Sequence, residues 1–272
     1  MEGSVKKVST ESRTVAIVTG ASSGIGLAIS KKLCALGYEV YGIGRNFEEA
    51  EVVKDENARE DQMMQQEEKV IPGQERDRGH YGEFHPVVCD LLDTDKLCEI
   101  IRNIAAEQEI YILVNNAGVG YYGLHEELNP KKIRELVRTN LETPMILTQQ
   151  LLRDLKKNKG YVINVASVTA SQSNPHGCAY GATKAGLASF SRSLFDETRK
   201  YRVKVVTISP DMTGTNLYRN ADFEADEAIE ARLLPEDVAE AVNWILSQRE
   251  NLVVTDITLK PQLHRIKKKR KG

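Results

Sequence analysis

Short apolar runs alternate with longer amphipathic segments along the 272-residue chain. The apolar runs have the length and the β-branched content of buried strands. They cover residues 14–19, 39–43, 84–89, 110–115, 161–166, 203–208 and 252–259. The longest helical segments between them cover residues 130–157, 178–201 and 235–248. Strands separated by helix-length segments predict an α/β fold: one domain with a doubly wound, Rossmann-like parallel sheet of seven strands and helices on both faces.

Two segments depart from this alternation. The first, residues 46–83, carries twelve acidic and five basic residues between positions 48 and 83, with few apolar anchors. We expect a solvated helix or a mobile, loosely packed insertion there. The second segment, about residues 261–272, has five consecutive basic residues at positions 267–271. It predicts a flexible, solvated terminus, with nuclear targeting or nucleic-acid contact as the alternative.

Composition and charge narrow the class of protein. With 41% hydrophobic and 28% charged residues, the chain can bury a sizeable core. Without the five basic residues of the tail, 32 basic and 39 acidic residues remain, a net charge of −7, which argues against a broad nucleic-acid-binding face. No apolar run reaches the roughly 18–20 residues of a membrane helix, and the first residues lack a signal-peptide core. We therefore expect a cytoplasmic protein with neither membrane nor nucleic-acid partners.

The four cysteines are scattered along the sequence. Cys34, Cys89, Cys98 and Cys178 show no CxxC spacing. This pattern is typical of reduced thiols in a reducing compartment, and it suggests no metal site.

A glycine-rich turn follows the first predicted strand, with the sequence TGASSGIG at positions 19–26. Glycines at this point let the backbone approach a pyrophosphate closely, and the helix N-terminus that follows offers free N–H groups. A tight strand-to-helix turn without a ligand is the alternative. The candidate cofactor-binding residues of this turn are Gly20, Ser22, Ser23, Gly24, Ile25 and Gly26.

The end of the second predicted strand bears on the choice of cofactor. NAD-binding folds place an acidic residue here for the ribose hydroxyls, but this chain has Gly44, Arg45 and Asn46. A guanidinium can pair bidentately with a 2′-phosphate, so Arg45 favours NADP(H) over NAD. A solvent-exposed arginine after a strand is the alternative.

Two further strand ends carry candidate cofactor contacts. Asp90 and Leu91 follow the third strand, where a carboxylate could accept a hydrogen bond from an adenine amino group; equally, Asp90 could be a helix cap or a turn residue. Asn116, Ala117 and Gly118 follow the fourth strand, where Asn can brace the backbone and small residues let a cofactor pack. A simple turn is the alternative for this motif.

Tyr180 and Lys184 are four residues apart within a predicted helix, so their side chains share one face. A nearby ammonium stabilises a phenolate, which would lower the tyrosine pKa toward the working pH and suit it to proton transfer. Ser167, at the end of the fifth strand, could hold the same substrate oxygen. With ten tyrosines in the chain, a pair with this spacing could also arise by chance.

Taken in order, these motifs resemble the short-chain dehydrogenase/reductase family, in its single-domain, NADP-preferring branch. TGASSGIG matches the cofactor turn TGxxxGxG of that family, and NNAG matches its fourth-strand motif. Asn140, Ser167, Tyr180 and Lys184 match the order and spacing of its catalytic tetrad. The likeness extends from residue 14 to about residue 259.

The resemblance implies a role for each tetrad residue in hydride transfer between the nicotinamide and a carbonyl or secondary alcohol. Tyr180 would be the general acid/base, and Ser167 would orient and polarise the carbonyl. Lys184 would bind the nicotinamide ribose and lower the pKa of Tyr180. Asn140 would hold a water that links Lys184 to bulk solvent.

The resemblance also implies where the loop after the sixth strand lies. Pro210, Thr213 and Thr215 would contact the nicotinamide end of NADP(H). The family usually has Pro-Gly at this point, whereas this chain has Pro210 followed by Asp211. The aspartate can change the path of the loop over the nicotinamide.

The expected substrate pocket draws on residues 119–124, 168–178 and 212–218. Polar Asn174 and loop residue His176 fall within it, and no arginine cluster does. This composition favours a bulky neutral ketone or a hydroxysteroid-like compound over a phosphorylated or small acidic one. The apolar and aromatic surface would come from Tyr121, Tyr122, Met212, Leu217 and Tyr218.

Two other functions remain open. A 3-oxoacyl-thioester reductase would use the same chemistry and would need basic residues near the pocket mouth for a carrier phosphate. A regulatory or scaffolding protein could bind NADP without turnover, although binding alone does not require both Ser167 and Tyr180. The resemblance further implies a homo-oligomer, a dimer or a tetramer.

Overall fold

The computed structural model describes residues 14–47 and 81–269. A seven-stranded sheet with the order β3-β2-β1-β4-β5-β6-β8 forms its centre, and every pairing in it is parallel. This result confirms the predicted doubly wound α/β fold. The strands are β1 (Val15–Thr19), β2 (Glu39–Gly44), β3 (Phe84–Val88), β4 (Ile110–Asn115), β5 (Tyr161–Val165), β6 (Lys204–Pro210) and β8 (Asp256–Leu259).

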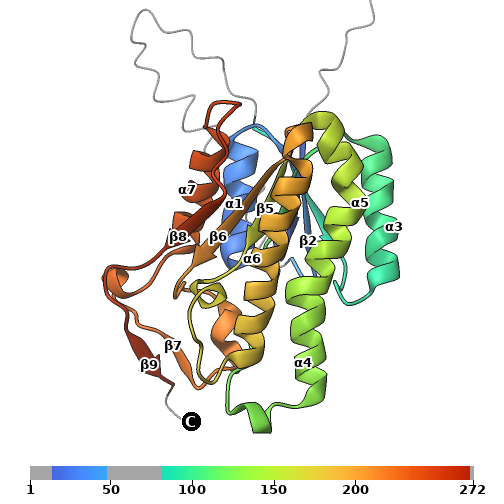
Figure 1. Cartoon of the computed structure of the whole chain (residues 1–272). Helices are drawn as coiled ribbons and strands as arrows, with labels where there is room; N and C mark the ends of the chain where they lie inside the picture. Colours follow the sequence, from blue (N-terminus) through green and yellow to red (C-terminus); the bar gives the residue numbers. More distant parts are fainter. Residues whose placement is uncertain (1–13, 48–80, 270–272) are drawn as a thin grey trace, which may run out of the picture.

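Helices cover both faces of the sheet (Figure 1). The helices are α1 (Gly24–Ala35), α3 (Thr94–Glu107), α4 (Pro130–Val137), α5 (Thr143–Asn158), α6 (Cys178–Thr198) and α7 (Pro235–Leu246). One core cluster joins α1 and α7 to the sheet, and a second joins α3, α5 and α6 to the opposite face. Strand β1 shows why: Ala16 and Val18 belong to the first cluster, whereas Val15 and Ile17 belong to the second.

Short elements complete the described chain. They are the 3-10 turns η1 (His125–Glu127), η3 (Val168–Ala170), η4 (Arg199–Tyr201), η5 (Asn216–Asn220) and η6 (Ile229–Ala231), the π-helical turn η2 (Arg138–Glu142), and two strands outside the main sheet, β7 (Phe223–Ala225) and β9 (Ile266–Lys268). No helix in the described ranges combines the length and the apolar character that a membrane crossing requires.

The structure bears on three further predictions from the sequence. Residues 252–255 are not strand, because only Asp256–Leu259 pairs with β6. Within the segment predicted to be a flexible tail, residues 266–268 form β9, which pairs with β7 as an antiparallel ribbon. Most of the predicted acidic insertion, residues 48–80, lies outside the described residues, so its character stays a prediction.

Candidate functional site

One cavity of about 230 Å³ opens at the carboxyl edge of the sheet. In a doubly wound fold this edge, where the strand order reverses between β1 and β4, is the expected ligand position. The cavity is lined by nearly all the predicted cofactor residues: Gly20, Ser22, Ser23, Gly24, Ile25, Arg45, Asp90, Leu91, Asn116, Ala117, Gly118, Pro210, Thr213 and Thr215. Ser167, Tyr180 and Lys184 line the same cavity. Gly26, Asn46 and Asn140 are not among its lining residues.

The glycine turn has a conformation that larger residues would not tolerate. Gly20 and Gly24 have positive φ angles of 67° and 54°. A Cβ on Gly26 would lie 2.1 Å from the carbonyl oxygen of Gly20, so this glycine permits the close contact between turn and helix. The Ser23 side chain makes no cap hydrogen bond at the start of α1, which leaves the first-turn N–H groups suited to an anion.

Asn116 and Thr19 brace this turn. The Thr19 hydroxyl accepts hydrogen bonds from the backbone N–H groups of Asn116 and Ala117, both at 3.1 Å. The Asn116 amide donates in return to the carbonyl oxygen of Thr19 at 2.9 Å. The ends of β1 and β4 are therefore locked together where the two strands border the cavity.

The ends of β2 and β3 form one end of the cavity. Arg45 lies exposed at its lining, next to Gly44, where a Cβ would come within 3.1 Å of the Ser22 hydroxyl. Asp90 accepts the backbone N–H of Leu92 at 3.0 Å, so the turn role considered for this residue is present in the structure. The end of β2 therefore presents the guanidinium of Arg45 to the cavity and no carboxylate.

A break in the long helix positions Asn140. Residues 130–157 were expected to form one helix, but η2 interrupts it between α4 and α5. Pro144 explains the interruption, because its ring lacks an N–H and conflicts with the carbonyl of residue 140. The freed turn lets the buried Asn140 side chain bond both backbone groups of Val119 at 2.9 Å, and its amide also donates to Thr183.

This geometry bears on the predicted role of Asn140. Both amide protons of its side chain are already donated within the protein, to Val119 and Thr183. A water-holding role would have to use the remaining acceptor capacity of its oxygen. The structure instead brings Asn140 and Lys184 to either side of Gly118, since a Cβ there would lie 3.6 Å from each side chain.

The tyrosine and lysine of the tetrad share one buried face of α6. The ammonium of Lys184 lies 5.8 Å from the Tyr180 ring centroid and donates to the carbonyl oxygen of Val165 at 2.8 Å. Tyr180 and Lys184 are 4% and 3% exposed. The Ser167 hydroxyl caps η3 by accepting the N–H of Thr169 at 3.2 Å, which fixes it at the end of β5.

The expectation of a lowered tyrosine pKa is wrong for this structure. Burial raises the pKa of Tyr180 to about 12, and the neighbouring Ser167 hydroxyl lowers it only in part. Burial also lowers the pKa of Lys184 to about 8, so the ammonium is itself poorly solvated and directed at a carbonyl. At neutral pH the phenol therefore keeps its proton, which suits it to act as an acid.

Three aromatic rings beyond Tyr180 form an aromatic wall, of which Tyr218 lines the cavity. The Tyr122 ring lies 5.8 Å from that of Tyr180, 6.1 Å from that of Tyr218 and 5.1 Å from that of Phe223, measured between centroids. Of the apolar and aromatic residues expected in the pocket, Leu217 and Tyr218 line the cavity, whereas Tyr121, Tyr122 and Met212 are not among its lining residues. Among the other expected pocket residues, Tyr121 donates to Glu135 at 2.7 Å, and His176 has a φ of 62° in a loop.

The loop after β6 begins with the unusual Asp211. Its carboxylate accepts the N–H of Met212 at 2.8 Å and lies 3.5 Å from the imidazole of His264. The Thr213 hydroxyl donates to the Asp211 carbonyl at 2.9 Å, and Thr215 caps η5. Asp211 therefore contacts the C-terminal segment through His264, and Thr213 and Thr215 line the cavity.

The sequence analysis did not predict several lining residues: Ile43, Cys89, Leu92, Glu135, Thr139, Val165, Ala166 and Arg219. Some could have been found from the fold alone, because Ile43, Cys89 and Val165 lie at or beside strand ends on the same edge. Glu135 on α4 and Arg219 on η5 do not lie at a strand end, so the fold alone does not predict that they line the cavity.

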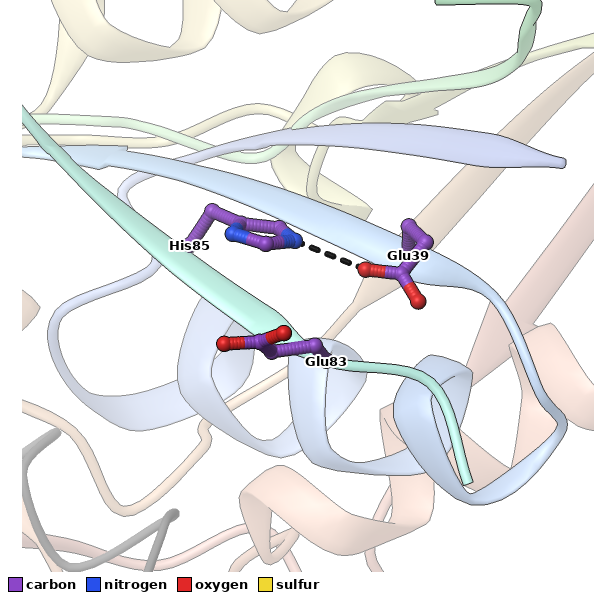
Figure 2. A group of neighbouring side chains, drawn as sticks. All are labelled: Glu39, Glu83 and His85. Atoms are coloured by element: carbon purple, nitrogen blue, oxygen red, sulfur yellow. Dashed lines mark hydrogen bonds and ion pairs between the residues drawn. The ribbon is translucent and has the colours of Figure 1, made fainter. Parts of the chain in front are cut away.

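A second group of polar residues lies elsewhere in the fold, on β2 and at the start of β3 (Figure 2). The His85 imidazole lies 2.7 Å from the Glu39 carboxylate, and exposed Glu83 completes three metal-type donors. Glu39 begins β2, Glu83 precedes β3 and His85 is the second residue of β3, so all three lie at the edge of the sheet opposite the cavity. The pairing of His85 with the buried Glu39 accounts for this contact without a metal.

Comparison with known proteins defines the class. A family model described as short chain dehydrogenase matches residues 14–225, so the chain belongs to the short-chain dehydrogenase family of oxidoreductases. An uncharacterized oxidoreductase of Staphylococcus epidermidis is 29% identical over 248 residues, which is 91% of this chain and 96% of that protein. The family and enzyme class predicted from sequence are confirmed.

Solved structures agree in fold. An alcohol dehydrogenase of Thermococcus sibiricus complexed with 5-hydroxy-NADP superposes with a TM-score of 0.78 at 23% identity, covering 94% of this chain and 99% of that one. A metagenomic short-chain oxidoreductase in complex with NADP is 28% identical, with a TM-score of 0.72, 93% of this chain covered and 99% of that one.

Proposed function

We propose that this protein is an NADP(H)-dependent oxidoreductase that reduces a bulky, neutral ketone to a secondary alcohol. The observation that carries the proposal is that Ser167, Tyr180 and Lys184 line the same cavity as the glycine turn and Arg45. Binding and chemistry would then occur in one cleft. The NADP complex of the 28% identical metagenomic oxidoreductase supports the choice of cofactor.

The residues present fit this cofactor. A pyrophosphate needs backbone N–H groups and room, which the Gly20 to Gly24 turn and the start of α1 supply. A 2′-phosphate needs a cation beside a small residue, which Arg45 and Gly44 supply. When bound, NADPH supplies a hydride from its nicotinamide C4.

The residues of this chain would supply the proton and the positioning. The Tyr180 phenol, protonated at neutral pH because burial raises its pKa to about 12, would give its proton to the carbonyl oxygen as the carbon is reduced. Ser167 would hold that oxygen, and Lys184 would face the cofactor ribose. The alcohol product carries the transferred hydride and the tyrosine proton, and Lys184 would help to restore the latter.

The aromatic wall supports a bulky, weakly polar substrate. Tyr122, Tyr218 and Phe223 lie in ring contact beyond Tyr180, and Leu217 lines the cavity beside them. Arg219 also lines the cavity, which keeps an acyl thioester with an anionic carrier as the second candidate. A panel of bulky ketones, hydroxysteroids and 3-oxoacyl thioesters with NADPH distinguishes the two, and turnover of thioesters alone would overturn the ketone proposal.

The catalytic claim is tested by Tyr180→Phe, which we expect to lower kcat by about 10²–10⁴-fold while NADPH still binds. Tyr201→Phe, at an exposed position in η4, is the matched control and should leave kcat unchanged. If wild-type protein binds NADPH but reduces no compound of the panel, the regulatory alternative replaces the reductase.

A further inference from the structure

The C-terminal segment is built into the substrate side of the molecule. Strand β9 pairs with β7 in an antiparallel ribbon, with Lys268 opposite Phe223 and Ile266 opposite Ala225. Figure 1 shows this ribbon standing away from the main sheet. The Phe223 ring contacts that of Tyr218, which lines the cavity, so β9 is hydrogen-bonded to a strand that packs behind the cavity wall.

Charge explains why a basic tail adopts this position. Residues 222–230, which include β7, contain five acidic residues and no basic one. Residues 260–269, which include β9, contain five lysines and arginines and no acidic residue. Lys267 pairs with Glu227 at 2.9 Å, and the segment is fastened again where the N–H of Leu263 donates to the carbonyl of Glu230.

Lys269 makes the contact closest to the cleft. Its half-buried ammonium donates to the carbonyl oxygen of Tyr218 at 2.6 Å and to that of Arg219 at 3.3 Å. Its backbone N–H donates to the carbonyl of Asp222 at 2.8 Å. Tyr218 and Arg219 lie near the end of η5, and Asp222 lies in the turn after it. The Tyr218 carbonyl also accepts the N–H of Ala221 at 3.0 Å, so the ammonium is a second donor to an oxygen with two lone pairs.

Tyr218 links this contact to the chemistry. Its side chain lines the cavity, and its ring lies 6.1 Å from that of Tyr122, which in turn lies 5.8 Å from Tyr180. Anything that fixes the Tyr218 backbone therefore fixes one wall of the space in front of Tyr180. The ammonium of Lys269 does so from 51 residues away in the sequence.

We infer that Lys269 is a positioning residue for the reaction, and that the C-terminal strand sets substrate specificity by holding Tyr218 against the cleft. The inference rests on the proposed function and deepens it, because it assigns the substrate side of that same site. The basic residues of this segment thus bind an acidic segment of the same chain. Lys269 itself touches neither substrate nor cofactor in this account.

The test compares Lys269→Met, which keeps the apolar stem and removes the ammonium, with Lys268→Met at the preceding residue, the last of β9. We expect Lys269→Met to raise KM for a bulky ketone about tenfold, the loss typical of a charge-assisted hydrogen bond, with kcat changed less than about threefold. The Kd for NADPH should not change, which also reports that the variant is folded. Lys269→Arg should restore most of the affinity, and Lys268→Met should behave as wild type.

Amide hydrogen exchange keeps this inference separable from the proposed function. In Lys269→Met, and not in Lys268→Met, the amides of residues 216–225 should exchange faster, whether or not any substrate is known. If the wild type reduces no ketone, the proposed function is refuted, and the exchange result alone then tests whether Lys269 holds residues 216–225 in place. Unchanged exchange, or faster exchange with unchanged KM, would overturn the role given to Lys269.

Discussion

The two halves of the cleft are held by different kinds of interaction. On the cofactor half, Gly26 lies against Gly20, and Thr19 and Asn116 join two neighbouring strands, all through short contacts to backbone atoms. On the substrate half, the end of η5 is held by a side chain of a distant segment, Lys269, whereas Lys267 on the same segment makes only an exposed ion pair. The first half is fixed by local sterics, whereas the second depends on charges that can be exchanged without changing the fold.

The sharpest way to break the cofactor half is Gly26→Ala. The added Cβ would lie 2.1 Å from the Gly20 carbonyl oxygen and 2.5 Å from the Asn116 amide, so the turn or the helix must move. We expect a loss of at least about 3 kcal/mol in the free energy of unfolding, or no NADPH binding where the protein still folds. Urea unfolding and NADPH titration measure the two effects.

Gly181→Ala is the matched control, because it also replaces a glycine within a helix. Its Cβ would have no neighbour closer than 3.5 Å, so alanine should stabilise α6 by up to about 1 kcal/mol. Equal behaviour of the two variants would show that the backbone contact at Gly26 is not what secures the turn.

The second prediction concerns the buried ammonium between the two halves. Burial lowers the pKa of Lys184 from 10.5 to about 8, so below pH 8 the folded protein bears the full cost of a poorly solvated charge. Above pH 8 the folded state releases this proton while the unfolded state keeps it up to about pH 10.5, so the contribution of Lys184 to stability rises with pH in that window. Lys184→Met removes the group and with it this rise, at most about 3 kcal/mol.

The measurement is urea unfolding of wild type and Lys184→Met at a series of pH values. It should stop near pH 10, because the pKa of Tyr180 is raised from 10.0 and stability from this group falls as pH rises further. Parallel curves between pH 8 and pH 10 would contradict the lowered pKa of Lys184. We also expect Lys184→Met to lose most of its reductase activity.

The third prediction addresses cofactor choice. Arg45→Ala should weaken NADPH binding by about 10–100-fold and leave NADH binding nearly unchanged, because a charge-assisted pair with the 2′-phosphate contributes about 1.5–3 kcal/mol. Steady-state kinetics with both cofactors give the ratio. Arg102→Ala on α3, whose side chain donates to its own helix, is the control for a general loss of positive charge. If Arg45→Ala kept the wild-type preference for NADPH over NADH, Arg45 would not be the residue that binds the 2′-phosphate.

Features of the fold and of the site that follow from local sequence rules could be predicted from the sequence. The strands, the glycine turn and the Tyr180–Lys184 face follow from local rules of burial, sterics and helical spacing, and all are found. The break at Asn140 was equally available, since Pro144 stands four residues later. Pro144 lies near the middle of the helix predicted over 130–157, and the two amphipathic halves on either side of it share the helical periodicity that predicted one continuous helix.

The remaining features depend on tertiary context. The raised pKa of Tyr180 comes from how completely α6 and the aromatic wall bury it, which spacing alone does not reveal. The ribbon of β7 and β9 joins two short segments with little strand character of their own, and only their opposite charges hinted at a partnership. Non-local pairing of this kind is decided by the whole fold.

The smallest expected effect comes from the exposed pair on the substrate half. Lys267 and Glu227 lie 2.9 Å apart, with side chains 47% and 80% exposed, so water and salt screen the pair. Lys267→Ala should therefore leave the thermal unfolding midpoint and KM unchanged within error, in contrast to Lys269→Met on the same segment. A rise in KM as large as that of Lys269→Met would show that the summed charge of the strand, and not the contact with the Tyr218 carbonyl, holds the loop in place.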